Sequence, residues 1–228
     1  MKRDNFLSDV MKCNCGVANF DISNELVGIN NFKFAYAKTK ISTSKSLIAK
    51  KHNFYLANIT VKFRQELVNS SMKLTEQDKV VVADETVRDS VIKIANENFM
   101  YDRFHCDPNI SSQIASEIKG KWVDNFFKGK RGDKCFVILT NKIEAKGFLL
   151  TIIRQNEVVI DLIAVDQRFQ KEGVAGKLIK GMMSYYKQEY LIYSVGTQVS
   201  NIPSIKLYEK CGFSAVEYGL VWHYFNDK

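Results

Sequence analysis

The sequence predicts an α/β protein of the α+β type, in which helices flank a mixed, mostly antiparallel sheet and a smaller α/β domain precedes the main one. Three observations lead to this prediction. Residues 135–165 read as three apolar strands joined by short polar turns. Residues 158–183 combine an apolar strand, a polar loop and an amphipathic helix that opens near two glycines. The polar segment 69–78 separates these elements from a strand–helix–strand pattern nearer the N-terminus.

The first 76 residues are predicted to form the small α/β domain. Alternation predicts a strand over 32–38, the next segment predicts a short helix over 44–52, and a second strand is predicted over 53–63. This part has no cluster of titratable residues with catalytic spacing. With the linker at 69–78, the domains are 1–76 and 77–228.

The main domain is predicted to begin with a strand over 79–83 and a helix over 85–97. An aromatic and charged segment, 99–110, then leads into a long amphipathic helix over 110–128. Its composition fits a lid over a sugar site and, equally well, a loop whose aromatic side chains only pack.

The remaining strands complete the sheet. Segments 135–140, 147–154 and 157–165 predict an antiparallel meander. After a helical crossover, segment 191–195 is expected to pair in parallel, and segment 216–225 to return at the end of the chain.

The loop between the strand that ends at Val165 and the following helix is suited to hold a phosphate group. Its residues leave backbone N–H groups with little side-chain cover at a helix N-terminus: Gln170, Lys171, Glu172, Gly173, Val174, Ala175 and Gly176. A tight connection that only packs is the alternative. The spacing matches neither the P-loop nor the dinucleotide-binding fingerprint.

A second pattern follows over 196–213. Asn201 is a good N-cap, Pro203 suits the first turn, and Gly212 is placed to end the helix. Asn201 and Tyr208 are seven residues apart and therefore share one helix face, roughly 10 Å from each other along the axis. A capping Asn and a core Tyr are the structural alternative.

Composition narrows the class of protein. Apolar residues make up 46% of 228, enough for a sizeable core, and no apolar run is long enough to span a membrane. Five scattered cysteines and the lack of a secretory signal favour a reducing compartment, so we expect a cytoplasmic protein. We read Cys13 and Cys15 as ordinary thiols and expect no metal site. The net charge of +8 is spread over all segments without a nucleic-acid-binding motif; it suits phosphate-bearing substrates.

Together the two patterns resemble the GNAT family of acetyl-CoA-dependent N-acetyltransferases. Val165, Gln170, Gly173 and Ala175 match its motif A, and the segment from Asn201 to Phe213 matches the Asn-to-Tyr motif that follows it. The resemblance implies a GNAT fold with acetyl-CoA as cosubstrate and no metal. It assigns coenzyme A binding to Ile163, Ala164, Val165, Gln170, Lys171, Glu172, Gly173, Val174, Ala175, Gly176, Asn201 and Ser204.

The same resemblance implies direct transfer, in which a neutral amine attacks a thioester carbonyl. Tyr208 is the expected acid for the departing sulfur. For the base we consider Asp161, predicted to share a strand face with Val159, Ile163 and Val165. Three alternatives stay open: His105, Asp107 and His223. A chain of water molecules is a fourth.

Over nearly the whole chain the sequence looks like the dTDP-4-amino-4,6-dideoxygalactose N-acetyltransferases. This resemblance rests on the segment around 103–110 and on the small domain ahead of the GNAT unit. That similarity implies a nucleotide-linked amino sugar as acceptor. It assigns acceptor contacts to Arg103, Phe104, His105, Asp107 and Gln198. Neither nucleic acid nor membrane is an expected partner, and the domain pair is compatible with a homodimer. The alternatives are a protein, peptide or antibiotic N-acetyltransferase and a GNAT module that binds coenzyme A without catalysis.

Overall fold

The computed structural model describes residues 1–21, 25–66, 79–190 and 192–226. Its strands are β1 (Lys2–Arg3), β2 (Cys15–Ala18), β3 (Phe34–Lys40), β4 (Tyr55–Glu66), β5 (Val80–Val82), β6 (Lys134–Leu139), β7 (Ala145–Arg154), β8 (Glu157–Val165), β9 (Ile192–Gln198) and β10 (Ser214–Phe225). Its α-helices are α1 (Asn5–Met11), α2 (Thr43–Lys51), α3 (Arg88–Glu97), α4 (Ser112–Phe127), α5 (Val174–Tyr186) and α6 (Ile202–Lys210). Single 3₁₀ turns are η1 (Ile29–Asn31), η3 (Glu85–Val87) and η4 (Gln167–Phe169).

All described strands belong to one mixed sheet, in the order β1-β2-β3-β10-β4-β9-β8-β7-β6-β5. The predicted meander is confirmed, because β6, β7 and β8 pair antiparallel in sequence order. The predicted parallel pairing after the crossover is confirmed for β8 and β9. The fold class predicted from the sequence is therefore correct.

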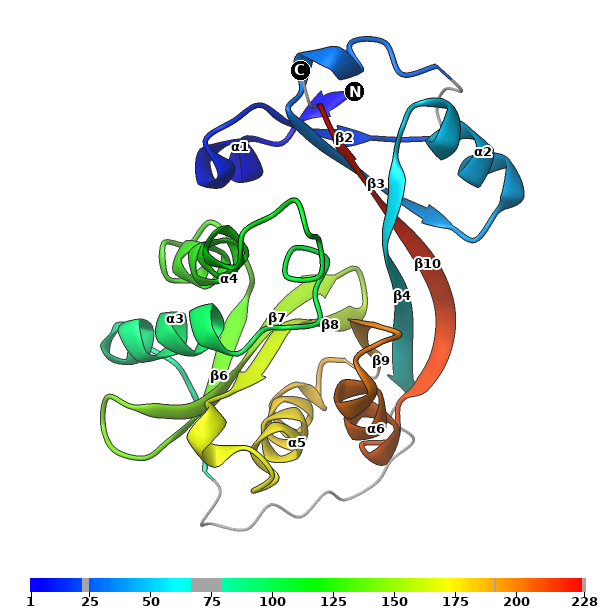
Figure 1. Ribbon diagram of the computed structural model, residues 1–228. Helices are drawn as coiled ribbons and strands as arrows, with labels where there is room; N and C mark the ends of the chain where they lie inside the picture. The colour runs from blue at the N-terminus through cyan, green and yellow to red at the C-terminus, as the bar shows by residue number, and fades with distance from the viewer. Residues whose placement is uncertain (22–24, 67–78, 191, 227–228) are drawn as a thin grey trace.

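The N-terminal part of the chain contributes directly to the sheet. β4 lies between β9 and β10 and pairs antiparallel with both, so β4 and β10 link the upper and lower parts of the molecule (Figure 1). The predicted linker over 69–78, the boundary near residue 76 and Leu191 lie outside the described residues. Residues 1–66 and the main part thus share one sheet.

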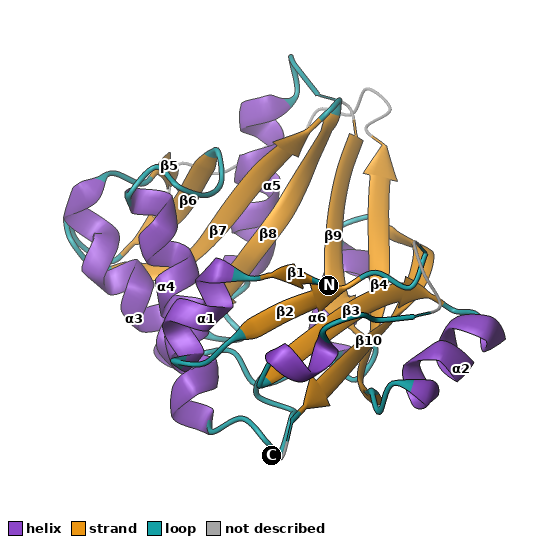
Figure 2. Cartoon of the chain, turned by 90° about the horizontal axis from the view of Figure 1, so that it is seen from above, coloured by secondary structure: helices purple, strands orange, loops and turns teal. Residues whose placement is uncertain are grey.

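Helices cover both faces of the sheet (Figure 2). On one face, α5 and α6 pack over β4 and β6–β9 through a core that includes Leu178, Met182 and Tyr208. On the other face, α3 and α4 cover β6–β8 through Val91, Val123 and Phe148. The sheet therefore separates two apolar layers.

The sequence analysis missed the first helix and the strands beside it. Asp4 caps α1 by accepting a hydrogen bond from Leu7 N at 2.9 Å, and it also accepts one from the Tyr36 hydroxyl at 3.1 Å. Leu7 then packs with Phe104 and Ile118 in a core between α1, β3 and α4. A helix of seven residues has little stability alone, so its formation depends on these tertiary contacts.

Three further findings concern the described residues. None of their helices is long and apolar enough to cross a membrane. They contain no cluster of three or more His, Cys, Asp or Glu residues arranged to hold a metal ion. All five cysteines lie among them as free thiols, and the Sγ atoms of Cys13 and Cys15 are 3.7 Å apart.

Candidate active site

β8 and β9 run side by side for only part of their length. They pair in parallel from Glu157 to Ile160 on β8, which ends opposite Val195 on β9. Beyond these residues β8 is paired only with β7, and β9 is paired with β4. The two strands therefore diverge, and their facing N–H and C=O groups have no strand partner in the described chain. An extended ligand with amide groups can form hydrogen bonds in such an opening.

A β-bulge marks the point where the strands diverge. Thr151 of β7 lies opposite Ile160 of β8, but the preceding Leu150 lies opposite Leu162. Asp161 is therefore an extra residue on β8. The bulge lets β8 bend away from β9 while it stays paired with β7.

The bulge also changes which side chains share a face of β8. Ile160 contacts the core on the α5 side, and so do Ile163 and Val165, although simple alternation would place them on the opposite face. Asp161 instead binds Arg131, whose guanidinium stacks on an α4 side chain, so it faces the α4 side. The prediction that Asp161 shares a face with Ile163 and Val165 is therefore wrong, because the extra residue breaks the alternation.

β9 has a glycine where the opening begins. Gly196 directly follows Val195, and a Cβ atom added to it would meet no described atom within 4 Å. Its φ is not in the left-handed region, so the backbone itself does not require glycine. A glycine inside a strand often marks a close approach of a ligand. Gln198 lies two residues farther on, partly exposed and on the same face.

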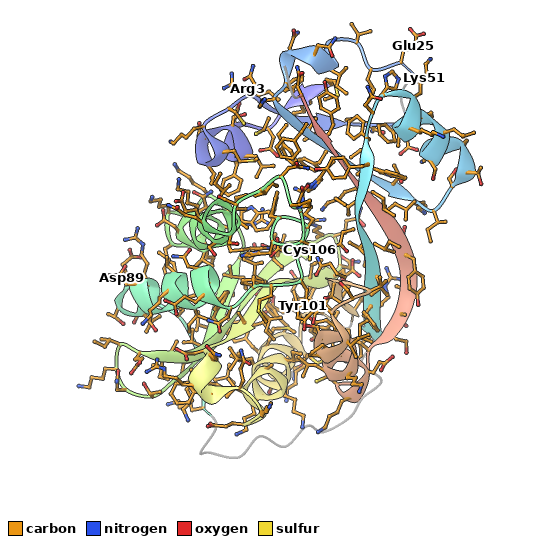
Figure 3. The ribbon with its side chains drawn as sticks, in the orientation of Figure 1. Arg3, Glu25, Lys51, Asp89, Tyr101 and Cys106 are labelled. Atoms are coloured by element: carbon orange, nitrogen blue, oxygen red, sulfur yellow. The ribbon has the colours of Figure 1, made fainter. Side chains whose placement is uncertain are left out.

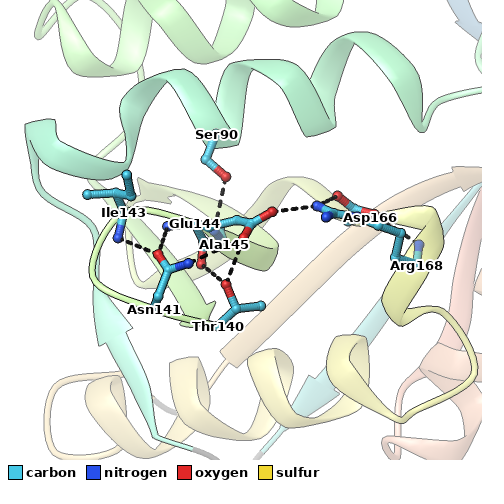
Figure 4. Close-up of polar contacts among 8 residues, drawn as sticks. All are labelled: Ser90, Thr140, Asn141, Ile143, Glu144, Ala145, Asp166 and Arg168. Carbon is cyan, nitrogen blue, oxygen red and sulfur yellow. Dashed lines mark hydrogen bonds and ion pairs between the residues drawn. The ribbon is translucent and has the colours of Figure 1, made fainter.

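The loop after β8 is fixed at its start by a polar network (Figure 4). Asp166 accepts hydrogen bonds from Arg168 N at 2.9 Å and from the Arg168 guanidinium at 3.0 and 2.8 Å. Arg168 also donates to Glu144 at 2.7 Å, and Thr140 and Asn141 donate to the same carboxylate. Hydrogen bonding from Arg168 holds the pKa of Asp166 below its usual value. The network ties this loop to the β6–β7 turn.

The loop itself has the backbone shape of an anion site. Lys171 and Gly173 both have positive φ values, +67° and +78°, and Gly173 is the N-cap of α5. No side chain of the described residues caps this helix end. The N–H groups of its first turn therefore face outward with partial positive charge. Gln170 donates from Nε2 to Val165 O at 3.3 Å and so ties the loop to the end of β8.

Among the residues assigned to coenzyme A, some are placed to offer backbone groups and others belong to the core. The side chains of Val174 and Ala164 are buried, so only their backbone atoms could contact a ligand. Lys171, Glu172 and Gly173 are exposed. The structure brings this loop to the same edge of the sheet as the diverging end of β8.

Helix α6 carries the second predicted group. Asn201 caps it by accepting a hydrogen bond from Ser204 N at 3.2 Å, as its N-cap position predicts. Tyr208 is only 3% exposed and packs beside the rings of Phe63 and Phe213. Burial raises the pKa of Tyr208 well above its usual value, more than a hydrogen bond with Ser204 lowers it. Tyr208 therefore keeps its proton at all physiological pH values.

Two aspartates of the segment between α3 and α4 each bind a histidine. His105 Nδ1 lies 2.5 Å from Asp102 Oδ2, and His223 Nδ1 of β10 lies 2.5 Å from Asp107 Oδ2. Burial alone would raise the pKa of Asp102, but Lys119 and His105 outweigh it and hold the value low. Tyr101 and Cys106 of this segment lie near the centre of the molecule in Figure 3.

Arg103 lies between the segment and the N-terminal strands. Its guanidinium stacks on the rings of Tyr36 at 3.8 Å and Phe104 at 4.2 Å, and Nη1 is 3.3 Å from His223 Nε2. Since a guanidinium cannot accept a hydrogen bond, His223 Nε2 must be the acceptor and Nδ1–H must donate to Asp107. His223 is therefore a neutral imidazole with both nitrogens engaged, which makes it a poor base for a substrate proton.

The acceptor contacts expected from the sequence are mostly inside the protein. Phe104 and Asp107 are 1% and 3% exposed and contact the chain's own side chains. Neither residue lines the cavity of about 330 Å³. Arg103 is buried but lines this cavity, His105 is partly buried and binds Asp102, and Gln198 lies at the opening between the strands.

Acidification is expected to destabilise the fold through His223. Burial, and then Arg103, lower the pKa of His223 below 6.5, against the opposing effect of Asp107. The unfolded state therefore binds more protons than the folded state below pH about 6.5, and stability falls as the pH drops from there. The melting temperature of the wild type should fall more between pH 7.5 and 5.5 than that of His223→Asn. The difference should be about 2–4 °C for each kcal/mol of unfolding free energy that the wild type loses through protonation of His223.

The control for this test is His52→Asn, at a half-exposed residue that follows α2. Asn at 223 retains an N–H group near Asp107, so the variant keeps one polar contact while it removes the titration. Equal pH dependence of melting in the wild type and His223→Asn would contradict the expected role of this histidine.

The sequence analysis missed a cationic hollow beside the opening. A cavity of about 330 Å³ has three cations and one carboxylate in its lining, which comprises Asp4, Phe6, Leu7, Tyr36, Arg103, Trp122, Asn125, Lys130 and Arg131. Arg131 connects the cavity to β8, since its guanidinium donates to both oxygens of Asp161 at 2.8 and 2.7 Å. These residues come from separate parts of the chain, and no local spacing in the sequence could have grouped them.

Comparison with known proteins agrees with this geometry. Residues 94–213 match the model of the acetyltransferase (GNAT) family. A curated relative, the spore coat polysaccharide biosynthesis protein SpsD of Bacillus subtilis, is 27% identical over 141 residues; the match covers 61% of this chain and 48% of the relative. The chain thus spans about half the length of that relative.

Two solved structures share the fold at low sequence identity. A GCN5-related N-acetyltransferase from Sphaerobacter thermophilus has a TM-score of 0.59 at 12% identity, covering 84% of this chain and 59% of that chain. A conserved protein of unknown function from Staphylococcus epidermidis has a TM-score of 0.61 at 12% identity, covering 86% and 73%. The family match covers more than half of the chain and the diverging strands, the glycine loop and α6 all lie within it, so the chain belongs to the acetyltransferase (GNAT) family.

Proposed function

We propose that this enzyme transfers the acetyl group of acetyl-CoA to the amine of a nucleotide-activated amino-deoxy sugar of the dTDP-4-amino-4,6-dideoxyhexose type. The observation that carries the proposal is the cationic hollow joined to the diverging strands through the Arg131–Asp161 pair. Such a hollow suits a small anionic acceptor better than a polypeptide chain. The role in polysaccharide biosynthesis named for the Bacillus subtilis relative also supports a sugar acceptor.

The residues of the opening fit coenzyme A. The uncapped start of α5 and the positive φ values of Lys171 and Gly173 suit a pyrophosphate, and the open space at Gly196 suits an arm that passes between β8 and β9. Acetyl-CoA supplies an acetyl group activated as a thioester. The unpaired N–H groups of β8 after the bulge at Asp161 would hold the arm and stabilise negative charge on the carbonyl oxygen.

Tyr208 is our candidate acid, and a water molecule is our candidate carrier for the proton of the amine. Both partly buried carboxylates of β8 are held by cations, Asp161 by Arg131, and Glu157 by Lys62 at 3.2 Å and an arginine at 3.4 Å. A carboxylate in a two-hydrogen-bond ion pair is a weak base. We therefore propose that Asp161 positions Arg131, which differs from the role as base that the sequence suggested.

A substitution at Gly173 tests the coenzyme A loop. Gly173→Ala places a side chain on a residue with φ of +78°, which costs about 1–2 kcal/mol for an L-residue. We expect a lower melting temperature and about 10-fold weaker coenzyme A binding, measured by calorimetry. Gly28→Ala is the matched control, because Gly28 has the same φ of +78° in a turn of the N-terminal part. Coenzyme A affinity equal to the wild type in Gly173→Ala would contradict the assignment.

The acceptor is tested by thiol release from acetyl-CoA. The purified protein is assayed with no acceptor, with dTDP-4-amino-4,6-dideoxygalactose, with its gluco epimer, and with a UDP-linked amino sugar. We expect release that depends on one nucleotide sugar, and the product mass should increase by one acetyl group. Release with none of them, despite coenzyme A binding, would refute the sugar acceptor and point to a protein, peptide or antibiotic amine.

A further inference from the structure

Three sulfur atoms meet where helix α1 ends and strand β2 begins. Cys13 Sγ lies 3.7 Å from Cys15 Sγ, and Cys15 Sγ lies 3.7 Å from Met11 Sδ. Cys15 is fully buried, whereas Cys13 and Met11 are partly exposed. None of the three lines the cavity of about 330 Å³ or belongs to the opening between β8 and β9, so the cluster is separate from the candidate active site.

The backbone around the two cysteines is fixed by hydrogen bonds. Cys15 N donates to Ser8 Oγ at 3.0 Å, and Cys15 O accepts from Asp4 N at 2.8 Å. The carbonyl of Asn14, the residue between the cysteines, accepts from two backbone N–H groups where β3 begins, at 2.9 and 3.2 Å. The contact between the thiols is therefore maintained by the fold, because the chain cannot move them apart without breaking these bonds.

The two thiols differ in their access to solvent. Cys13 is the one that a dissolved oxidant can reach. Burial, and then the charge of Cys13, raise the pKa of Cys15 above its usual value, so Cys15 remains a thiol at neutral pH. Cys15 Sγ donates to Met11 Sδ, which leaves the lone pairs of the Cys15 sulfur free to face Cys13. This orientation suits attack by Cys15 on an oxidised Cys13 sulfur, and the contact between the two atoms offsets the low nucleophilicity of a thiol.

We propose that Cys13 and Cys15 form a reversible oxidation site for peroxides. A peroxide oxidises the Cys13 thiol to a sulfenic acid and is itself reduced to water or an alcohol. The Cys15 sulfur then attacks the Cys13 sulfur, so that an S–S bond forms, the S–O bond of the sulfenic acid breaks, and the hydroxyl leaves as water with the proton of Cys15. The two thiols together have lost two electrons and two protons, and a dithiol reductant restores both by thiol–disulfide exchange. The inference does not depend on which amine the enzyme acetylates.

The second cysteine makes the oxidation of the first reversible. A sulfenic acid without a neighbouring thiol reacts with further peroxide to give a sulfinic acid, which thiols do not reduce. Cys106 offers a comparison in the same protein, because it is exposed and its sulfur contacts a backbone carbonyl, Met100 O at 3.6 Å, rather than a second thiol of the described chain. A transient disulfide of this kind is also the form expected in a reducing compartment.

The test follows the peptide that contains both cysteines by mass spectrometry. The full chain, at low protein concentration to avoid disulfides between molecules, is treated with hydrogen peroxide, and the remaining thiols are alkylated before digestion. In the wild type we expect this peptide to lose two hydrogens and to take up no alkylating reagent, and dithiothreitol added before alkylation should restore two alkylated thiols. The Cys106 peptide of the same sample should gain oxygen instead. Both thiols of the pair still alkylated when Cys106 is oxidised would overturn the proposal.

Three variants assign the roles of the two thiols. In Cys15→Ala the same treatment should convert Cys13 to a sulfinic acid that dithiothreitol does not reverse. In Cys13→Ser, which changes a partly exposed residue and leaves the core intact, the buried Cys15 should stay reduced. Cys106→Ser is the matched control, because it removes an exposed thiol away from the pair and should form the disulfide as the wild type does. Thermal unfolding of each reduced variant checks that it is folded.

Two results with these variants would contradict the assignment. Full recovery of Cys13 by dithiothreitol in Cys15→Ala would show that Cys15 does not resolve the sulfenic acid. Oxidation of Cys15 in Cys13→Ser at the rate seen in the wild type would show that the peroxide does not enter through Cys13.

Discussion

Gly196→Leu is expected to abolish acetyl transfer without weakening the fold. A Cβ atom added to Gly196 would meet no described atom within 4 Å, and its φ is outside the left-handed region, so a side chain can be added there without backbone strain. Leucine also favours a strand more than glycine does, so the melting temperature should stay equal or rise slightly. Because a strand side chain projects from the face of the sheet, the leucine would stand beside the opening between β8 and β9 and narrow the approach to it. We expect kcat/KM to fall by about 100-fold or more.

A size series serves as the control for this prediction. Gly196→Ala adds one carbon and should lose less activity than Gly196→Leu, while the melting temperatures of the two variants stay close to that of the wild type. Steady-state rates of thiol release and thermal unfolding are measured on the same preparations. A fully active Gly196→Leu enzyme would show that the opening beside Gly196 is not the route to the reacting groups. A large loss of melting temperature would show that the space is needed for the fold.

The sequence predicted best those elements whose signals are local. The bounds of β8 agree at both ends, because a turn precedes this apolar strand and a polar loop follows it. The helix expected over 110–128 is α4 at Ser112–Phe127, where Ser111 caps the start. The N-terminal helix α1 was missed because its seven residues show too little periodicity and depend on contacts with α4.

Features that depend on distant parts of the chain could not be predicted in this way. The place of β4 between β9 and β10 joins residues 55–66 to residues about 130–170 positions later, and alternation along a strand does not reveal its partners. The bulge at Asp161 is equally invisible in the pattern, and it was enough to reverse the predicted face of Ile163 and Val165. The cavity beside Arg131 is likewise invisible in the pattern, because its lining residues come from α1, β3, the segment before α4 and the end of α4.

Tyr208→Phe is expected to slow catalysis while coenzyme A binding is kept. Burial raises the pKa of Tyr208, so the phenol is fully protonated in the resting enzyme and can donate to a departing sulfur. A phenol with a raised pKa is also a weaker acid, so we expect a loss near the lower end of the usual range for general acids, about 100-fold in kcat. The affinity for coenzyme A should change little, because only one hydroxyl is removed from a side chain that is otherwise buried in the core.

Tyr193→Phe is the matched control for Tyr208→Phe. Tyr193 of β9 is fully buried, and its hydroxyl donates to Tyr190 O at 2.9 Å and lies 3.3 Å from Met183 O, so the change removes a hydroxyl of the same kind from the same core. Each substitution should cost about 1 kcal/mol of stability or less through its lost hydrogen bond. Only the change at 208 should reduce kcat if its hydroxyl serves as the acid. Equal kcat values for the two variants would assign Tyr208 to the core alone, and the departing sulfur would then take its proton from water.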